Sequence, residues 1–458
     1  MGELSSSSAF SRSTLTRIIV YSLYFFYYLL LNSAHVEGFD SLLRLPHSGA
    51  SRTRPRSKRV FYVNDFGAKG DGVNDDTKAF EDVWKLVCSF PSRAKVIIPA
   101  GKTYLVRPII FGGPCRSKLT LEISGTIIAP KDPDAWAGLN PQKWLEFQRV
   151  NHLTVEGGGI IEGMGQEWWA RSCKINTTNP CHHAPTALIF HRCKNLKVRN
   201  LMILNSQQMH MAFTSCDRVA ASHLRVLAPG SSPNTDGIHI SASTRVQIKN
   251  SVIGTVQVSQ GVEWVMLSSG IVVKGPATYL VWQLFGYPDQ EHHLWTRPWY
   301  KIHDVVVDGA FLSNTENGVR IKSWQGGSGF ATNIAFQNVW MENVSNPIII
   351  DQYYCDSPVT CQNQSLAVKV EDISFVGIKG TSATEEAIKF ACSETFPCER
   401  LYLEDIQLVS YSGDSTRSFC WEAQGSCSGL VYPPPCFSYN DSSYIEQKVL
   451  SSSVLWSI

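Results

Sequence analysis

Two polar residues in SPNTDGIHIS, residues 232–241, have types and a spacing that could support chemistry. Asn234 and Asp236 are two positions apart, so an extended run would direct both side chains to one face of a strand. Gly237 and an apolar-polar-apolar alternation follow, and they predict that a strand begins here. The stretch is therefore either a polar turn that precedes a strand or one half of a catalytic site.

A second pair of candidate residues is cationic and lies in GVRIK, residues 318–322. Arg320 and Lys322 also stand two apart, so a strand would place both on one face while the intervening residues point into a core. An arginine can hold a carboxylate through two parallel hydrogen bonds, and a lysine adds a point charge. The pair predicts an anionic substrate if it shares a groove with Asp236, and otherwise it is a solvated strand face.

The elements that must position these residues are short strands that recur from Val60 onward. Runs such as KVIIPA, NLKVRNLMIL and RVQIKNSVIG are rich in β-branched residues and are separated by Gly, Asn, Asp or Pro. The matching positions Asn195, Arg218 and Arg245 are 23 and 27 residues apart, without helices between them. Such a period predicts an all-β solenoid, here a right-handed single-stranded parallel β-helix. A barrel or a propeller is the alternative, but the turns between single strands are too irregular for either.

One short helix is predicted from Asp76 to about Cys88, at the N-terminal end of the solenoid. Its apolar residues, Phe80, Val83, Trp84 and Val87, have helical spacing. We expect the Asp75–Asp76 pair to cap the free N–H groups at the start of this helix.

The first 36 residues predict export from the cell. Arg12 and Arg17 precede an uninterrupted apolar run over residues 18–31, and small polar residues follow. The run is short for a bilayer span, so a secretory signal is favoured over a single-pass anchor. The mature protein is expected outside the cell and free of the membrane.

Beyond the signal we expect a Ser/Arg-rich linker over residues 37–59, one β-helix domain over residues 60–436 and a tail over residues 437–458.

Cysteines and glycosylation sequons favour the same compartment. The chain has 13 cysteines, and short loops closed by disulfides suit an oxidising environment. No cysteine spacing is that of a zinc finger, and no cofactor or metal is indicated. A formal charge of +2 without a basic stripe argues against a nucleic-acid partner. The close pairs are Cys173 with Cys181, Cys355 with Cys361, Cys392 with Cys398, and Cys420 with Cys427 near Cys436, and the sequons are at Asn176, Asn343, Asn363 and Asn440.

Four motifs in a fixed order carry a resemblance to a known family. VNDFGAKGDGVNDDTKAF (63–80), NTDGIHIS, NGVRIKSWQGGSG (317–329) and NPIIIDQYYC (346–355) resemble plant-type polygalacturonases of glycoside hydrolase family 28. The similarity covers about 60–255 and 302–436. It implies a secreted, monomeric cell-wall enzyme on a right-handed β-helix, which hydrolyses the α-1,4 bonds of polygalacturonate in pectin with inversion.

The resemblance also implies roles for individual residues. In an inverting glycosidase, one carboxylic acid protonates the leaving oxygen while another carboxylate activates water across the sugar. By the family match, Asp236 is a catalytic base on the water-activating side. The substrate-binding residues implied are Asn234, Arg320, Lys322 and Tyr353, with Tyr354 beside it.

The other half of the family's site is missing from this sequence. Relatives continue with Gly-Asp-Asp-Cys, which supplies the acid and a second base, and later with Gly-His-Gly, whose histidine supports the acid. Here VQVS occupies 256–259, and ATYLVWQLFG stands where the histidine motif is expected. The atypical segment 256–301 keeps its length but contains four tryptophans and no cysteine. A shifted reading frame or a mis-joined exon would produce such a segment, and genuine divergence is the alternative.

The atypical segment leaves several outcomes open. Asp289 and Glu291 could substitute for the lost acid, although a solvated loop is the simpler interpretation. The chain is then a polygalacturonase with impaired activity, or a catalytically inactive pectin-binding protein of the cell wall. A further outcome is that the segment disrupts two coils and the chain does not fold stably.

Overall fold

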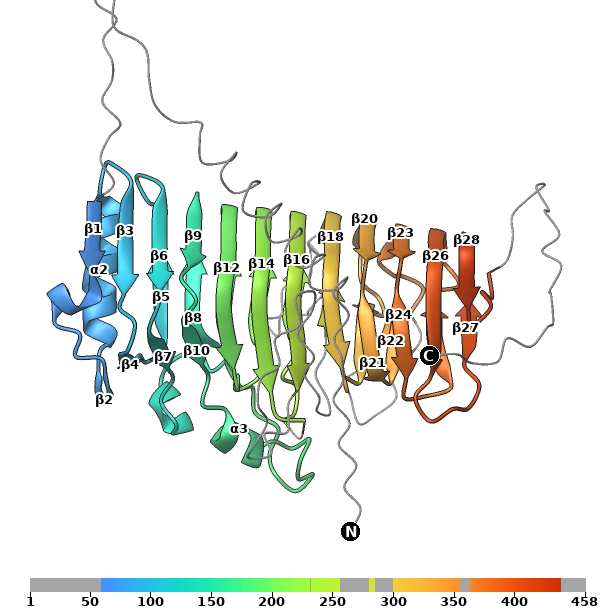
Figure 1. Ribbon diagram of the computed structural model, residues 1–458, viewed down its shortest axis with the longest axis horizontal. Helices are drawn as coiled ribbons and strands as arrows, with labels where there is room; N and C mark the ends of the chain where they lie inside the picture. The colour runs from blue at the N-terminus through green and yellow to red at the C-terminus, as the bar shows by residue number, and fades with distance from the viewer. Residues whose placement is uncertain are drawn as a thin grey trace, which may run out of the picture. The chain divides into compact units, whose positions relative to one another are not determined.

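The computed structural model describes residues 59–230, 232–255, 280–284, 300–354, 362 and 364–437. Successive strands lie side by side along one axis, from the N-terminal coil at one end to the C-terminal coil at the other (Figure 1). Almost every strand pairs in parallel with the strand one coil away in sequence. The predicted right-handed parallel β-helix is confirmed.

Three sheets form the walls of the solenoid. Sheet A contains β1 (Arg59–Tyr62), β2 (Asp71–Asp75), β3 (Ala94–Ile98), β4 (Thr103–Leu105), β6 (Leu119–Ile123), β7 (Thr126–Ile128), β9 (Leu153–Glu156), β10 (Ile160–Glu162), β12 (Lys194–Leu204), β14 (Asp217–Ala228), β16 (Thr244–Thr255), β18 (Tyr300–Ser313), β20 (Gly329–Gln337), β21 (Trp340–Val344), β23 (Lys369–Val376), β24 (Lys379–Ser382), β26 (Cys398–Ser410) and β28 (Ala423–Tyr432). Sheet B contains β5 (Ile109–Gly112), β8 (Lys143–Gln148), β11 (Thr186–His191), β13 (Met211–Thr214) and β15 (Ile238–Ser241). Sheet C contains β17 (Leu280–Leu284), β19 (Asn317–Trp324), β22 (Asn346–Tyr354), β25 (Glu386–Ala391) and β27 (Arg417–Trp421).

The register of sheet A agrees with the period read from the sequence. Lys194 is opposite Asp217, and Asp217 is opposite Thr244, so Asn195, Arg218 and Arg245 stack as predicted. These positions belong to a column of residues with φ between 53° and 58°, the left-handed region that few residues other than glycine adopt. The column marks the same outer corner on each coil, and its members are His152, Asn195, Arg218, Arg245, Asp304, Asn333, Asp372 and Arg400.

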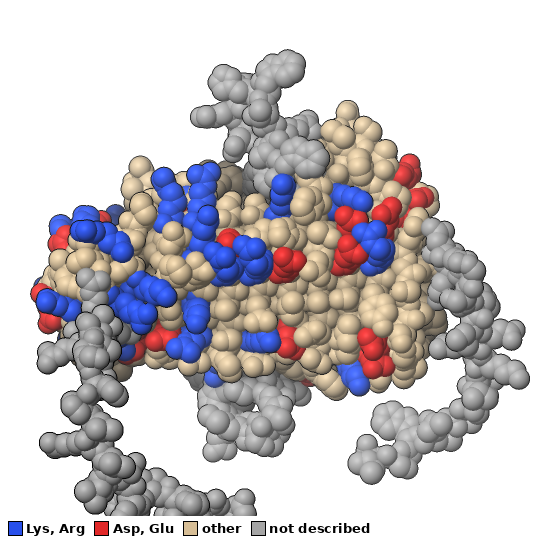
Figure 2. Space-filling view, turned by 90° about the horizontal axis from the view of Figure 1, so that it is seen from above, with Lys and Arg blue, Asp and Glu red and all other residues tan. Residues whose placement is uncertain are grey.

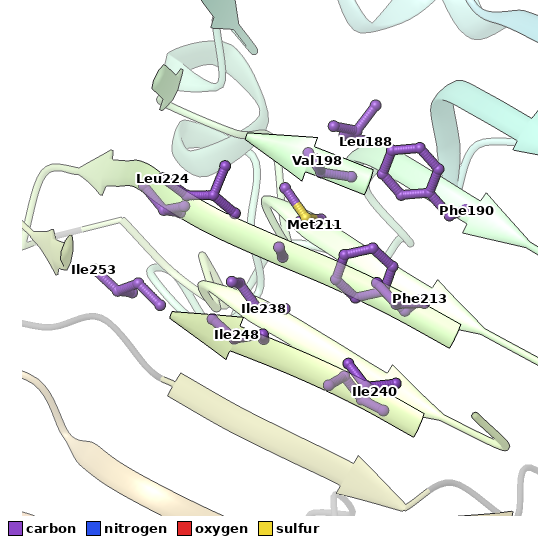
Figure 3. Close-up of a cluster of buried hydrophobic side chains, with 14 of the residues drawn as sticks. Leu188, Phe190, Val198, Met211, Phe213, Leu224, Ile238, Ile240, Ile248 and Ile253 are labelled. Atoms are coloured by element: carbon purple, nitrogen blue, oxygen red, sulfur yellow. The ribbon is translucent and has the colours of Figure 1, made fainter. Parts of the chain in front are cut away.

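An aromatic stack occupies the core behind sheet B. Phe111, Phe147, Phe190 and Phe213 come from consecutive coils, and neighbouring rings are stacked with centroids 4.7, 5.2 and 5.4 Å apart. Ile240 follows Phe213 in the register and ends the stack. Figure 3 shows these side chains of β11, β13 and β15 meeting apolar side chains of β12, β14 and β16. The strand that follows Asp236 therefore rests on a stacked aromatic column.

Helix α2 (Thr77–Ser89) covers the N-terminal end of this core, as predicted (Figure 1). Trp84 lies 5.1 Å from Phe111 between ring centroids, and its indole N–H donates to the carbonyl of Gly112. The predicted capping is only half right. Asp75 accepts from the backbone N–H of Thr77, but Asp76 accepts from the backbone of Lys69 and Gly70 in the preceding loop. The smaller helical elements are α3 (Gln166–Ala170), η1 (Val63–Phe66) and η2 (Pro133–Trp136).

Four disulfides lie in the described part of the chain. The predicted pairs Cys173–Cys181 and Cys392–Cys398 are present. Cys420 bonds to Cys436 rather than to Cys427, which lies on β28 in a different sheet from Cys420 on β27. Cys88–Cys115 joins α2 to the loop after β5, a pairing that no short spacing indicates.

Several predictions concern residues outside the described ranges. They are the signal over residues 1–36, most of the linker, most of the tail, the Cys355/Cys361 pair and most of the atypical segment. β1 begins at Arg59, next to the predicted start of the folded domain. Within the described ranges, the structure contains no helix of the length and apolar character that a bilayer crossing requires.

On the two sides of the atypical segment, β16 pairs directly with β18. Val246 lies opposite Val305, and Ile253 lies opposite Leu312. The ladder of sheet A is therefore continuous at this point.

Candidate active site

Asp236 lies in the turn that leads into β15, not on the strand itself. Asn234 has a φ of 55° and is exposed on this turn. The run is therefore not extended at Asn234, so the condition under which Asn234 and Asp236 would share a strand face is not met. Ser232 and Thr235 stabilise the turn through a hydrogen bond between their hydroxyls, 2.6 Å long.

His210 holds the backbone of Asp236 in place. The N–H of His210 donates to the carbonyl of Asp236 at 2.8 Å, and its Nδ1 lies 3.1 Å from the same oxygen. Its Nε2 lies 3.1 Å from the carbonyl of Leu227 in the neighbouring sheet. Burial lowers the pKa of His210, although these carbonyl contacts act to raise it. Two sheets thus fix the main chain at Asp236.

The Asp236 carboxylate contacts Nε2 of His239, which lies three residues later near the start of β15. Only 13% of the Asp236 side chain and 5% of the His239 side chain are exposed. Burial acts to raise the pKa of Asp236, but His239, Lys322 and Arg320 outweigh it and bring the pKa below its ordinary value. Asp236 is therefore an ionised carboxylate at neutral pH, which is the state that a catalytic base requires.

Arg320 and Lys322 lie on one face of β19, while Val319 and Ile321 are buried in the core, as predicted. Arg320 and Lys322 both lie close enough to Asp236 for their positive charges to lower its pKa. The structure thus brings together three side chains that the sequence placed on separate segments.

The two cations are held by residues of β22. Arg320 donates to Oδ2 of Asp351 at 2.8 Å. The ring of Tyr354 lies under both cations, with its centroid 5.2 Å from the Arg320 guanidinium carbon and 3.9 Å from Lys322 Nζ. Tyr353, the predicted groove residue, instead donates its backbone N–H to Asp351 at 3.1 Å. The adjacent Tyr354 is therefore the tyrosine beside the cations.

Two buried donors beside these residues lack an acceptor. Nε of Arg320 and Nδ2 of Asn317 have no hydrogen-bond partner among the residues that the structure describes. A buried donor without an acceptor destabilises the protein by about 1–3 kcal/mol. A substrate whose oxygen accepts a hydrogen bond from such a donor therefore binds more tightly. The Arg320 donor, on the outer face of β19, suits an oxygen-rich ligand, whereas Asn317 shares the inward face of Val319 and Ile321.

A hollow of about 360 Å³ continues from His239 along the outer face of sheet B. Its lining includes Lys143, Glu146 and His191. The Glu146 carboxylate is fully buried and lies 3.0 Å from Lys143 Nζ and 3.4 Å from His191 Nδ1. Burial acts to raise the pKa of Glu146, but His191 and Lys143 outweigh it and lower the pKa. Glu146 therefore orients two nitrogen-bearing side chains along the hollow.

Sequence reasoning missed His210, His239 and Asp351 as direct neighbours of the predicted residues, and it named Tyr354 only beside Tyr353. Each of the two histidines stands inside an apolar run, which is the only signal that the sequence offers for them. Within the described ranges, no cluster of His, Cys, Asp or Glu side chains could hold a metal ion. The candidate substitutes Asp289 and Glu291 lie outside those ranges.

We predict that Asp236 makes the stability of the protein depend on pH. Its lowered pKa means that its ionised form stabilises the fold at pH values above the ordinary Asp pKa of about 3.9. This contribution is lost as the pH falls through the lower pKa of the folded state. We expect Asp236→Asn to reduce the fall in Tm between about pH 5 and pH 3, measured by thermal unfolding. The matched change at the exposed Asp65 should leave the wild-type curve unaltered, and equal curves for all three proteins would contradict the prediction.

Comparison with known sequences identifies relatives over nearly the whole chain. A protein of Arabidopsis thaliana named as a probable polygalacturonase is 52% identical over 92% of this chain and 93% of its own length. A polygalacturonase of Persea americana is 46% identical over 84% of this chain and 82% of its own length.

Solved structures share the fold at low sequence identity. An endo-xylogalacturonan hydrolase from Aspergillus tubingensis has a TM-score of 0.59 at 19% identity, over 81% of this chain and 99% of that one. An exopolygalacturonase from Thermotoga maritima has a TM-score of 0.58 at 16% identity, over 81% of this chain and 91% of that one.

The sequence profile described as Glycosyl hydrolases family 28 matches residues 88–263 and 295–428, and it leaves most of the atypical segment unmatched. Together with the relatives that are 52% and 46% identical over most of the chain, this match shows that the protein belongs to family 28 of the glycosyl hydrolases.

Proposed function

We propose that this family member is a polygalacturonase that binds polygalacturonate, the anionic backbone of pectin, but hydrolyses it at a strongly reduced rate. The observation that carries the proposal is that Arg320 and Lys322 share one face of β19 and lie near enough to Asp236 to lower the pKa of its carboxyl. Two cations beside a carboxylate base suit a substrate that carries its own carboxylates and is attacked by water.

Each side chain then has a distinct role. Asp236 is the base that takes a proton from the attacking water, and His239 fixes the orientation of its carboxylate. Arg320 and Lys322 bind a galacturonate carboxylate, and Tyr354 supports both cations from below. Tyr353 and the exposed Asn234 are proposed as outer substrate contacts. The hollow along sheet B receives further sugar units of the polymer.

The impairment rests on what residues 256–301 lack. A general acid must protonate the leaving oxygen, and removal of one lowers the rate by roughly 10²–10⁴-fold. The segment has no Asp-Asp pair after Gly254-Thr255 and no Gly-His-Gly motif. The alternative function is that of a catalytically inactive pectin-binding protein, which would keep the cationic site and release no product. Sequencing the transcript across the segment separates a reading-frame change from genuine divergence.

The remaining parts of the proposal concern location and organisation. The apolar run over residues 18–31 supports a cleaved signal and export to the cell wall, and the disulfides within the described ranges support an oxidising compartment. After cleavage we propose a monomeric, membrane-free protein with one β-helix domain over residues 60–436.

A short oligomer, trigalacturonate, tests the cationic site directly. We expect Lys322→Met to weaken its binding about ten- to hundredfold by titration calorimetry, because the change removes a buried charge and keeps the volume of the side chain. Lys85→Met, at an exposed position of α2, is the control and should bind like the wild type. Equal affinities for the three proteins would refute the proposed site. Release of reducing ends in the same samples distinguishes the impaired enzyme from the inactive binding protein.

A further inference from the structure

A second groove lies on the outer face of sheet A, away from the site built on sheets B and C. It has a volume of about 780 Å³ and runs across the strands β3, β6, β9, β12, β14, β16 and β18. Six spacings of about 4.8 Å give it a length of about 29 Å along the axis of the solenoid. A straight groove of this length suits an extended polymer better than a compact small molecule.

The rim of this groove is the left-handed corner described above. Arg93, Lys118, Arg218 and Arg245 occupy the rim on different coils, and Lys197 stands on the adjacent column. The name basic groove is used below for the hollow with these five cations. Figure 2, which views the molecule from above Figure 1, shows more Lys and Arg toward the N-terminal end than toward the C-terminal end.

The floor of the basic groove is open because its residues are small. Thr120, Thr154 and Ala220 occupy the same column as Lys197 on neighbouring coils. Hydroxyl groups and a methyl group leave room for a ligand and can contact sugar hydroxyls and ring faces. Apart from histidine, the lining contains no aromatic ring on which the bases of a single-stranded nucleic acid could stack.

The charge of the basic groove is only partly compensated. Arg218 and Arg245 share the carboxylate of Asp217. Arg93, Lys118 and Lys197 form no ion pair with any residue that the structure describes. At the C-terminal end of the same column, by contrast, Arg400 is neutralised by acidic side chains of its own coil and the preceding one. The lining of the groove therefore holds five cations against the single carboxylate of Asp304.

We propose that the basic groove is a second binding surface for polygalacturonate, separate from the site at Asp236. This inference rests on the proposed function for the identity of the polymer. Polygalacturonate carries one carboxylate on each sugar along an extended chain, and the groove presents cations on successive coils. Each exposed ion pair is weak, so the surface favours long polymers over short oligomers and loses affinity at high salt. It would retain the protein on pectin while the other site engages a chain end or an internal bond.

The test compares charge reversal in the groove with charge reversal elsewhere. One variant carries Arg93→Glu, Lys118→Glu and Lys197→Glu, and a milder version carries Gln at the same positions. The control carries Lys78→Glu, Lys85→Glu and Lys131→Glu, which are exposed positions outside the groove. Co-sedimentation with insoluble polygalacturonate is measured at low and high salt, and trigalacturonate binding is measured by calorimetry. Thermal unfolding verifies that each variant is folded.

We expect the groove variant to bind the polymer about tenfold more weakly than the control at low salt, with the Gln version in between. Its affinity for trigalacturonate should equal that of the wild type. Polymer binding equal to that of the control would overturn the inference, and so would binding to anionic phospholipid vesicles without binding to polygalacturonate. If Lys322→Met leaves trigalacturonate binding unchanged while the groove variant still loses the polymer, the proposed active site fails and the basic groove stands.

Discussion

Replacement of residues 256–301 by a segment that carries the Gly-Asp-Asp-Cys and Gly-His-Gly motifs of the family should raise the rate of polygalacturonate hydrolysis by roughly 10²–10⁴-fold. The expected gain is that of a general acid, because the rest of the proposed site is already present in this chain. The Asp236 carboxylate has a lowered pKa, and the charges of Arg320 and Lys322 contribute to that lowering. The measurement is release of reducing ends from polygalacturonate by the purified wild-type protein and the chimera under the same conditions.

The control for this exchange is the same chimera with Asp236→Asn. It should lose the regained activity, because the carboxylate that we propose to activate water is then replaced by a neutral amide while the acid is present. A wild-type protein that turns over as fast as the chimera would show that the atypical segment already supplies an acid. An inactive but folded chimera would show that the family role does not transfer to Asp236.

Phe213→Ala should lower the free energy of unfolding by about 3–5 kcal/mol. Phe213 is fully buried and stacks on Phe190 at 5.4 Å, so its truncation removes an aromatic contact and leaves a cavity within the column. The cavity would lie next to Ile240 in β15, the strand that follows Asp236. Denaturant unfolding gives the change in stability. Because stacked repeats can unfold in stages, amide hydrogen exchange in β11, β13 and β15 is measured as well.

The matched control for this change is Phe419→Ala. Phe419 lies on β27 and is 40% exposed, so its removal leaves no enclosed cavity and should cost about 1 kcal/mol or less. If the two substitutions cost the same, the aromatic stack does not contribute the stability that its burial implies. Phe213→Leu keeps most of the buried volume and should fall between the alanine variant and the wild type.

The period of the sequence predicted the solenoid well because stacking is a nearest-neighbour property. Asn195, Arg218 and Arg245 align in the structure at the spacing that the sequence gives, since each coil must return its apolar residues to the same face. The cationic face of β19 was predictable for the same reason, because alternation along a strand is a local rule.

The local rule failed where the chain is not a strand. Asn234 adopts a left-handed conformation, so the two-residue spacing to Asp236 does not mean a shared face. The contact of Asp236 with His210 depends on how a turn lies against two sheets, and no spacing in the sequence predicts it. The Cys88–Cys115 disulfide joins a helix to a distant loop, so it too was beyond the reach of short-range pattern.

The direct pairing of β16 with β18 has a consequence for the mechanics of the molecule. Each coil of a solenoid is bonded only to the coils before and after it, so its stability is nearly a chain of neighbour couplings. The sheet A hydrogen bonds that couple residues 59–255 to residues 300–437 run through the contacts from Thr244 opposite His303 to Gly254 opposite Ser313. Within sheet A, this ladder is what joins the two halves of the solenoid. A grafted segment can restore the chemistry at Asp236 only if it leaves the pairing of β16 with β18 intact.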